Sequence, residues 1–403
     1  MQDEPNLGAR LRVLRKWRGL TLVELAQLSG VSKSQLSAVE RGTRLLDRRS
    51  HIAALAGALR VSETELTGLP HISRDPEQSA PHSIVPLLRE SLTGNTFDDP
   101  AVDRARPLAE LESLLKGELA ELNNKADFAR RGQLAAPVFD ELHFHIATGD
   151  EASKRRSLAL LTEACEAVGM TLQYLGYRDL AYFAASRATE AARLLDDPII
   201  SGQAAYLRFQ LMPKPTSWDR PLAVALQAAA QLQPHIGSSR TASETYGMLH
   251  LSAGLAAAAV KKTELAEEYY QQAVEIGEKT GDNHDAWSAF GVTNVGIWGV
   301  AIAMELGDYE GAVQRSKGVD PSRLPHRERR AVFYADTGRA LAHLRGKERN
   351  AVDQLQRAEA IAPQRIRNSG SVQETITYLL NKHMRTSPAV ELRGMATRMG
   401  VLH

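Results

Sequence analysis

Residues 20–42, LTLVELAQLSGVSKSQLSAVERG, contain the pattern that decides the fold of the N-terminal part of this chain. Thr21 and Ser32 are each followed three residues later by Glu or Gln, which is the capping-box pattern of a helix start. Gly30 lies between the two helices and ends the first of them. The stretch therefore predicts two short helices joined by a tight turn.

The second helix of this unit presents short and basic side chains on its exposed face. Leu36 and Val39 are spaced i, i+3 and face the core. The opposite face is rich in hydroxyl groups, which suits close approach to base edges in the major groove of DNA. The residues that we expect to meet DNA are Thr21, Lys33, Ser34, Gln35, Ser37, Arg41 and Arg44.

Apolar and charged residues recur at fixed offsets through residues 7–69. They are Leu7, Gly8, Arg10, Leu11, Leu14, Arg15, Leu25, Ala26, Gly30, Val31, Ser32, Leu36, Val39, Glu40, Arg41, Gly42, Leu55, Ala56, Leu59, Val61 and Leu66. This set resembles the Cro/repressor (XRE) family of helix-turn-helix DNA-binding domains. The resemblance implies five helices and a structural ion pair between Arg15 and Glu40 across the small core. Asp47 and Arg48 depart from the family pattern, because a proline is common there before the fourth helix.

The composition describes a globular chain with an uneven distribution of charge. With 403 residues and 43% hydrophobic content, the chain is too long for one compact helical core, so we expect several domains. Residues 1–70 contain 11 Lys/Arg and 7 Asp/Glu, which makes this part attractive to phosphate although the whole chain carries only +1. Cys165 is the only cysteine, and the chain has neither a signal core nor a long apolar run. These features predict a cytoplasmic protein without a membrane segment.

From residue 108 onward the sequence reads as helix after helix, and small residues seven apart mark a repeat. They resemble the tetratricopeptide (TPR) repeat, in which paired helices pack closely. We expect an all-α chain with a five-helix helix-turn-helix domain over 1–69, a proline-rich linker over 70–107 and a TPR-like right-handed α-solenoid over 108–403. Residues 372–402 are expected to form two closing helices. The marking pairs are Ala181/Ala188, Ala223/Ala230, Ala266/Ala273, Ala312/Val319 and Ala351/Ala358.

The first helix of each pair should line the concave face of such a stack. Aromatic and polar residues at spacings of three and four fall on these helices. One interpretation is a groove for an extended peptide or a small aromatic metabolite, and the other is that the aromatic residues are core. Asn294 separates the two, because a buried amide needs a partner that a bound peptide backbone would supply. The candidate groove residues are Tyr246, His250, Trp287, Phe290, Asn294, Trp298, Arg330 and Tyr334.

An XRE head on a TPR-like body resembles the peptide-pheromone receptors of Gram-positive bacteria. The sequence is also similar to a group of actinobacterial XRE regulators, notably at residues 287–308, 319–330 and 387–401. The resemblance implies a transcriptional regulator that binds double-stranded DNA, without naming a ligand. We expect a homodimer on an inverted repeat, because one recognition helix reads too few base pairs, and a peptide or small-molecule effector that prefers one dimer state. The alternative is an interaction protein whose body binds a partner protein and whose head serves as a tether.

The sequence contains no motif of an enzyme. It lacks the G-x-x-x-x-G-K-[ST] pattern and the glycine pattern of dinucleotide-binding proteins. His143 and His145 lie two residues apart on a predicted helix and so point to different faces, which does not suit metal ligation. We expect no catalytic activity, no cofactor and no metal site.

Overall fold

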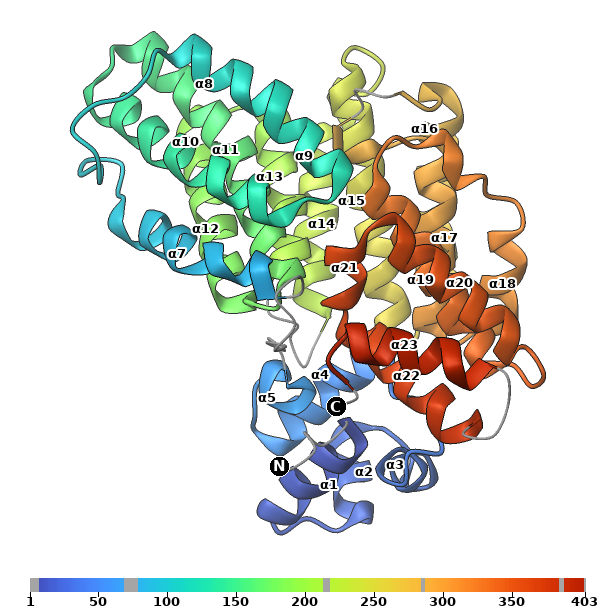
Figure 1. Cartoon of the computed structure of the whole chain (residues 1–403). Helices are drawn as coiled ribbons and strands as arrows, with labels where there is room; N and C mark the ends of the chain where they lie inside the picture. The colour runs from blue at the N-terminus through green and yellow to red at the C-terminus, as the bar shows by residue number, and fades with distance from the viewer. Residues whose placement is uncertain (1–6, 69–78, 213–217, 284–286, 384–387, 402–403) are drawn as a thin grey trace.

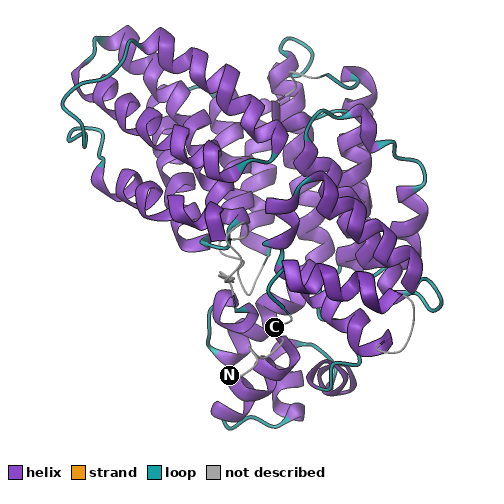
Figure 2. Ribbon diagram, viewed as in Figure 1, coloured by secondary structure: helices purple, strands orange, loops and turns teal. Residues whose placement is uncertain are grey.

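The computed structural model of this chain describes residues 7–68, 79–212, 218–283, 287–383 and 388–401. These residues form helices and connecting loops, and they contain no β-strand (Figure 2). A small head of five helices lies at one end of a larger helical body (Figure 1). The all-α prediction, with a helix-turn-helix domain followed by a long helical stack, is confirmed.

The head forms its helices where the sequence predicts them. Complete capping boxes at Thr21 and Ser62 start α2 and α5. Ser32 caps α3 by accepting the Gln35 amide N–H, but the Gln35 side chain does not close the box. Leucine, valine and alanine side chains from all five helices and the loops between them form one core. The helices are α1 Leu7–Trp17, α2 Leu22–Ser29, α3 Lys33–Glu40, α4 Arg49–Leu59 and α5 Glu63–Thr67.

The body is a stack in which each helix packs on the next one along the chain (Figure 1). Five pairs, from α11/α12 to α19/α20, form its main part, and α10 packs on the first pair. The helices are α10 Phe128–Thr148, α11 Glu151–Tyr174, α12 Arg178–Leu195, α13 Pro198–Leu211, α14 Asp219–Leu232, α15 Arg240–Ala259, α16 Thr263–Thr280, α17 Val292–Leu306, α18 Tyr309–Ser316, α19 Arg327–His343 and α20 Glu348–Ile361.

The residues that mark the repeat are buried in most, but not all, of these pairs. In α12, α16 and α20 the marking alanines are fully buried. In α14, by contrast, Ala223 and Ala230 are exposed and Ala225 and Leu232 are buried. Alanines occur all around α14, so residue type does not identify its buried face. In the fourth pair, Val319 lies beyond the end of α18.

Much of the predicted linker belongs to the body, which corrects the domain boundary at residue 107. From residue 79 the chain enters η1 (Ala80–Ile84) and α7 (Val85–Gly94), whose apolar side chains are buried in a core shared with α10. The prolines are misleading because Pro81 and Pro86 lie in the first turns of these helices, where proline is favourable. The part of the predicted linker before residue 79 lies outside the described residues.

Short helices and the C-terminal helices complete the body. The two expected closing helices, α22 and α23, pack on each other and on the last pair of the stack. These segments are α8 Leu108–Leu114, η2 Leu115–Leu119, α9 Ala120–Lys125, α21 Pro363–Arg367, α22 Gly370–His383 and α23 Pro388–Arg398.

Candidate DNA-binding face and ligand pocket

The second helix of the helix-turn-helix unit, α3, presents a polar face to solvent. Lys33 and Ser34 are exposed in its first turn, while Leu36 and Val39 are buried on the opposite side. Near its end, the exposed Arg41 guanidinium donates a hydrogen bond to the Ser37 hydroxyl. A donor-rich face with short side chains at its start can approach the edges of base pairs.

The other residues predicted to meet DNA lie in different surroundings. Arg44 is exposed in the loop after α3. Gln35 is partly buried, and its Nε2 lies 3.4 Å from Nδ1 of His51 in α4. Thr21 caps α2, with its hydroxyl 2.8 Å from a carboxylate oxygen of Glu24. Both Gln35 and Thr21 therefore have a structural partner within the head.

The Arg15 and Glu40 side chains form a two-pronged ion pair across the head. Nε of Arg15 lies 2.6 Å from Oε1 of Glu40, and Nη2 lies 2.8 Å from Oε2. A third nitrogen of Arg15 donates to the Leu20 carbonyl oxygen at 2.8 Å. The hydrogen bonds to Glu40 raise the pKa of Arg15. Both side chains are largely shielded from water, with 12% and 7% of their surfaces exposed, so the pair joins α1 to α3.

The body holds the head at the start of α4 through a buried carboxylate. Oε2 and Oε1 of Glu305, in α17, accept the backbone N–H groups of Arg49 at 3.1 Å and Ser50 at 2.9 Å. The Glu305 carbonyl oxygen accepts Nε of Arg48 at 2.7 Å. No side chain at the preceding position caps α4. The Glu305 side chain of the body therefore caps α4 in place of a side chain of the head.

Asp47 adds a second contact between the two parts. Its Oδ2 lies 2.9 Å from Nε2 of His343, whose ring stacks on Tyr309 with the centroids 3.6 Å apart. Nη2 of Arg339 donates to the Asp47 carbonyl oxygen at 3.1 Å. Burial by itself raises the pKa of Asp47, but the hydrogen bond from His343 and the charge of Arg339 outweigh it and lower the pKa. The two residues that depart from the XRE pattern, Asp47 and Arg48, thus both contact the body.

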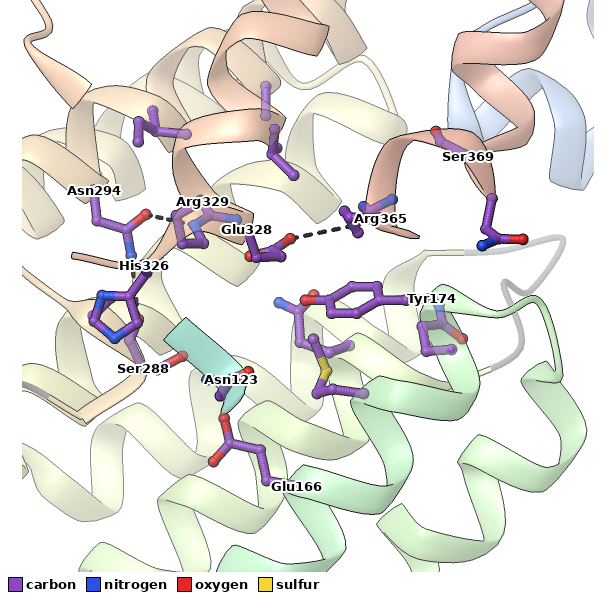
Figure 3. A pocket seen from close by; sticks show the side chains of 18 of the residues that line it. Asn123, Glu166, Tyr174, Ser288, Asn294, His326, Glu328, Arg329, Arg365 and Ser369 are labelled. Carbon is purple, nitrogen blue, oxygen red and sulfur yellow. Dashed lines mark hydrogen bonds and ion pairs between the residues drawn. The ribbon is translucent and has the colours of Figure 1, made fainter. Parts of the chain in front are cut away.

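A cavity of about 1110 Å³ lies between the body and the head. The first helices of the five pairs, α11, α13, α15, α17 and α19, all contribute to its wall, as expected for the concave face of the stack. Residues of η2 and α9 and of the segment around α21 complete the body's share, and Leu46, Arg49 and Ile52 reach it from the head. Figure 3 shows Glu328, Arg329 and Arg365 on the side opposite Tyr174 and Glu166. An occupant of this cavity would therefore touch both parts of the molecule.

Three of the predicted groove residues line this cavity, namely Trp287, Asn294 and Trp298. The spacing of three and four predicted that Trp287, Asn294 and Trp298 lie on one helix, which is wrong, because no single helix runs through residues 287–298. Trp287 belongs to the short helix η4 (Trp287–Ala289), and Ser288 has a left-handed φ of 53° before α17 begins. The break turns Phe290 away from the cavity and onto Gly247 of α15.

The remaining predicted groove residues, like Phe290, are not part of the cavity wall. Tyr246 donates to the Gln272 side chain, and Nδ1 of His250 lies 3.1 Å from the Tyr246 carbonyl oxygen. Tyr334 packs instead against the hydrophobic cores on either side of α19. The neighbour of Arg330, Arg329, lines the cavity in its place. The cavity is thus lined by other residues of α15 and α19 than those predicted, and a ligand groove at this place stays a prediction.

Asn294 has protein partners and also faces the cavity. Its Oδ1 accepts Nε of Arg329 at 2.9 Å, and its Nδ2 donates to the Ser288 carbonyl oxygen at 3.2 Å (Figure 3). The amide therefore does not require a bound peptide to satisfy it. Its role is to fix the Arg329 guanidinium, which lies 5.7 Å from the centroid of the Trp298 ring.

The histidines considered as metal ligands are engaged with other protein groups. Nδ1 of His143 lies 2.8 Å from the Phe139 carbonyl oxygen, and Nε2 lies 2.6 Å from Nη1 of Arg187. Burial lowers the pKa of His143 to about 4. Nε2 of His145 lies 2.7 Å from the Arg106 carbonyl oxygen. Within the described part of the chain, no group of three metal-ligating side chains comes together, and no helix is both long and apolar enough to span a bilayer.

Comparison with known families gives a match for the head. Residues 6–69 match the family model described as a helix-turn-helix domain. Neither the curated proteins nor the solved structures give a significant match to the chain. The head is therefore a helix-turn-helix domain, as found in DNA-binding regulators, and the resemblance of the body to TPR repeats and to actinobacterial regulators stays a prediction.

Proposed function

We propose that this chain is a sequence-specific, DNA-binding transcriptional regulator whose body binds an effector. The observation that carries the proposal is the exposed polar face of α3 within a helix-turn-helix domain. In this proposal α3 enters the major groove, and Lys33, Ser34, Ser37, Arg41 and Arg44 contact bases or phosphates. A homodimer reads an inverted repeat, because a single recognition helix covers too few base pairs. The proposed location is cytoplasmic, and no enzymatic step or cofactor is involved.

The effector acts through the cavity that the head and body share. Leu46, Arg49 and Ile52 lie on its wall, and the Glu305 carboxylate holds the start of α4 beside it. A ligand shifts the position of the head only if it binds one arrangement of head and body more tightly than the other. Contacts to both parts at once provide such a difference.

The test is a selection of binding sites from random duplex DNA by the full-length protein at ~150 mM salt, near physiological ionic strength. We expect an inverted repeat. Arg41→Ala should weaken binding to the selected site about tenfold or more, because one good arginine–base contact contributes roughly 1–3 kcal/mol of discrimination. Arg220→Ala, at an exposed position of α14, is the matched control.

The same selection is carried out with the Glu305→Ala variant, because this substitution removes a contact between the body and the head. Recovery of a sequence only with this variant would indicate that the body restrains DNA binding. Recovery of no sequence with either protein would contradict the proposal and favour a head that tethers the chain to a protein partner.

A further inference from the structure

Arg131 is a buried arginine whose guanidinium is not fully hydrogen-bonded within the described part of the chain. It lies in α10 with 4% of its surface exposed and faces the shared cavity. Its Nε and Nη1 have no hydrogen-bonding partner, and no carboxylate among the described residues forms an ion pair with it. Burial lowers the pKa of Arg131, and the nearest acidic groups, Glu166, Tyr174 and Glu328, only partly oppose this effect. A buried guanidinium in this state is costly unless an anion comes to it.

The acidic groups nearest to Arg131 do not neutralise it. Glu328 is already paired with Arg365, whose Nε lies 3.3 Å from its Oε1. Burial raises the pKa of Glu166, and this side chain forms no ion pair with Arg131 among the described residues. The positive charge of Arg131 is therefore left for an occupant of the cavity.

Trp298, on another wall of the cavity, is a second buried hydrogen-bond donor. Its ring is 5% exposed, it lines the cavity, and its Nε1–H has no acceptor among the residues that the structure describes. An indole N–H and a guanidinium donate hydrogen bonds but cannot accept them, so both require acceptor atoms from the occupant. The neighbouring walls carry the flat or apolar side chains of Trp287, Tyr206 and Met248.

We propose that this cavity binds a molecule with a single carboxylate on a flat, apolar body, and that Arg131 is its carboxylate partner. The guanidinium fork matches a carboxylate with two parallel hydrogen bonds. The apolar body lies against Trp298 and its neighbours. A small aromatic acid and the free C-terminus of a short apolar peptide both offer this group. The inference identifies the effector class of the regulator proposed above, but binding to the cavity is measured without DNA.

The test uses matched pairs of probes on the full-length protein. One set contains benzoate, 2-naphthoate and indole-3-acetate with their primary amides, and a second contains short apolar peptides with free or amidated C-termini. Binding is followed by tryptophan fluorescence and by thermal shift. We expect the carboxylates of one or both sets to bind at least tenfold more tightly than the amides, and Arg131→Gln to abolish this preference.

The matched control is Arg130→Gln. Arg130 is the adjacent residue of α10 and is exposed, so its substitution should leave the preference for carboxylates unchanged. Arg131→Gln should have a Tm equal to or above that of the unliganded wild type, because an unpartnered buried charge is removed. A fall of several degrees would indicate a structural role for Arg131 and overturn the inference.

Other outcomes also overturn the inference. They are equal binding of acids and amides, tighter binding of phenyl phosphate than of any carboxylate, and no binding of any probe up to ~1 mM, the range of weak ligands. The result is separable from the proposed function. If the protein binds carboxylates but selects no DNA site, the proposed regulator function is refuted and the ligand class stands. If it selects a DNA site but does not prefer carboxylates, the ligand class is refuted and the regulator function stands.

Discussion

The head and the body each bury an arginine, and the two lie in opposite surroundings. In the head, Arg15 is matched by both oxygens of Glu40 and by a backbone carbonyl. In the body, Arg131 is more deeply buried, and its Nε and Nη1 have no hydrogen-bonding partner among the described residues. A buried charge with a matched partner holds the fold together, whereas one without a partner works against the fold. Burial alone therefore does not show that an arginine stabilises the fold. The presence of a matched carboxylate partner does.

The largest effect should come from breaking the matched pair. Glu40→Ala leaves the Arg15 guanidinium buried without its carboxylate, at a cost of roughly 3–5 kcal/mol. We expect the head to unfold at a temperature or urea concentration at which the body stays helical, as followed by circular dichroism. Lys16→Ala, on the exposed side of the same helix as Arg15, should unfold like the wild type. A folded Glu40→Ala protein with a changed DNA sequence preference would show that Glu40 reads DNA instead.

Glu374 is an intermediate case, a largely buried acid with one backbone donor. The Leu7 N–H donates to its Oε1 at 2.9 Å, and burial raises the pKa of Glu374 to about 6 from 4.5. The folded protein therefore favours the protonated form. Because the folded protein holds the proton of Glu374 more tightly than the unfolded chain does, the bound proton stabilises the fold. This stabilisation is complete below about pH 4.5 and is lost as the pH rises through about 6.

Glu374→Gln should remove that pH dependence. Between pH 4.5 and 7 the wild type should lose up to about 2 kcal/mol of unfolding free energy that Glu374→Gln keeps, because one pKa unit corresponds to about 1.4 kcal/mol. Urea unfolding at several pH values measures the difference. Glu275→Gln, at an exposed position of α16, is the control. Parallel pH profiles of Glu374→Gln and the wild type would refute the raised pKa.

The smallest effect should come from the cap that the body provides. Glu305→Ala removes the acceptor of the Arg49 and Ser50 amides, and losing a helix cap costs about 1 kcal/mol. Hydrogen exchange at these two amides should become correspondingly faster, with little change in the body. Glu310→Ala, exposed on α18, should leave exchange unchanged. Unaltered protection in Glu305→Ala would mean that the head does not depend on the body.

The head was predictable from sequence because its signals are local. The starts of α2, α3 and α5 each have a capping side chain within three residues, and the Gly30 and Gly68 turns have positive φ. The pairing of Arg15 with Glu40 came only from the family resemblance, since the two are 25 residues apart. The succession of helix pairs was predictable in part, because the small residues that mark the repeat are buried in α12, α16 and α20.

The cavity was only partly predictable, because its wall depends on where helices are interrupted and on which helix faces turn inward. Neither leaves a clear signal in the sequence. Ser288 and Ala289 adopt left-handed conformations without being glycine, so their residue types do not reveal the break in η4. Arg329 and Arg330 are adjacent at the start of α19, and only packing decides which faces inward. Arg130 and Arg131 present the same ambiguity in α10. The sequence contains nothing that distinguishes the cavity-lining member of each pair.

The cap supplied by Glu305 also has a consequence for the order in which the chain is made. The carboxylate that completes α4 lies 256 residues after Arg49, whereas the caps of α2 and α5 lie within their own turns. Domains generally fold as units during synthesis, the N-terminal one first. The newly made head therefore exists for a time with the first amides of α4 bonded to water. It reaches its final form only when the fourth helix pair of the body has left the ribosome.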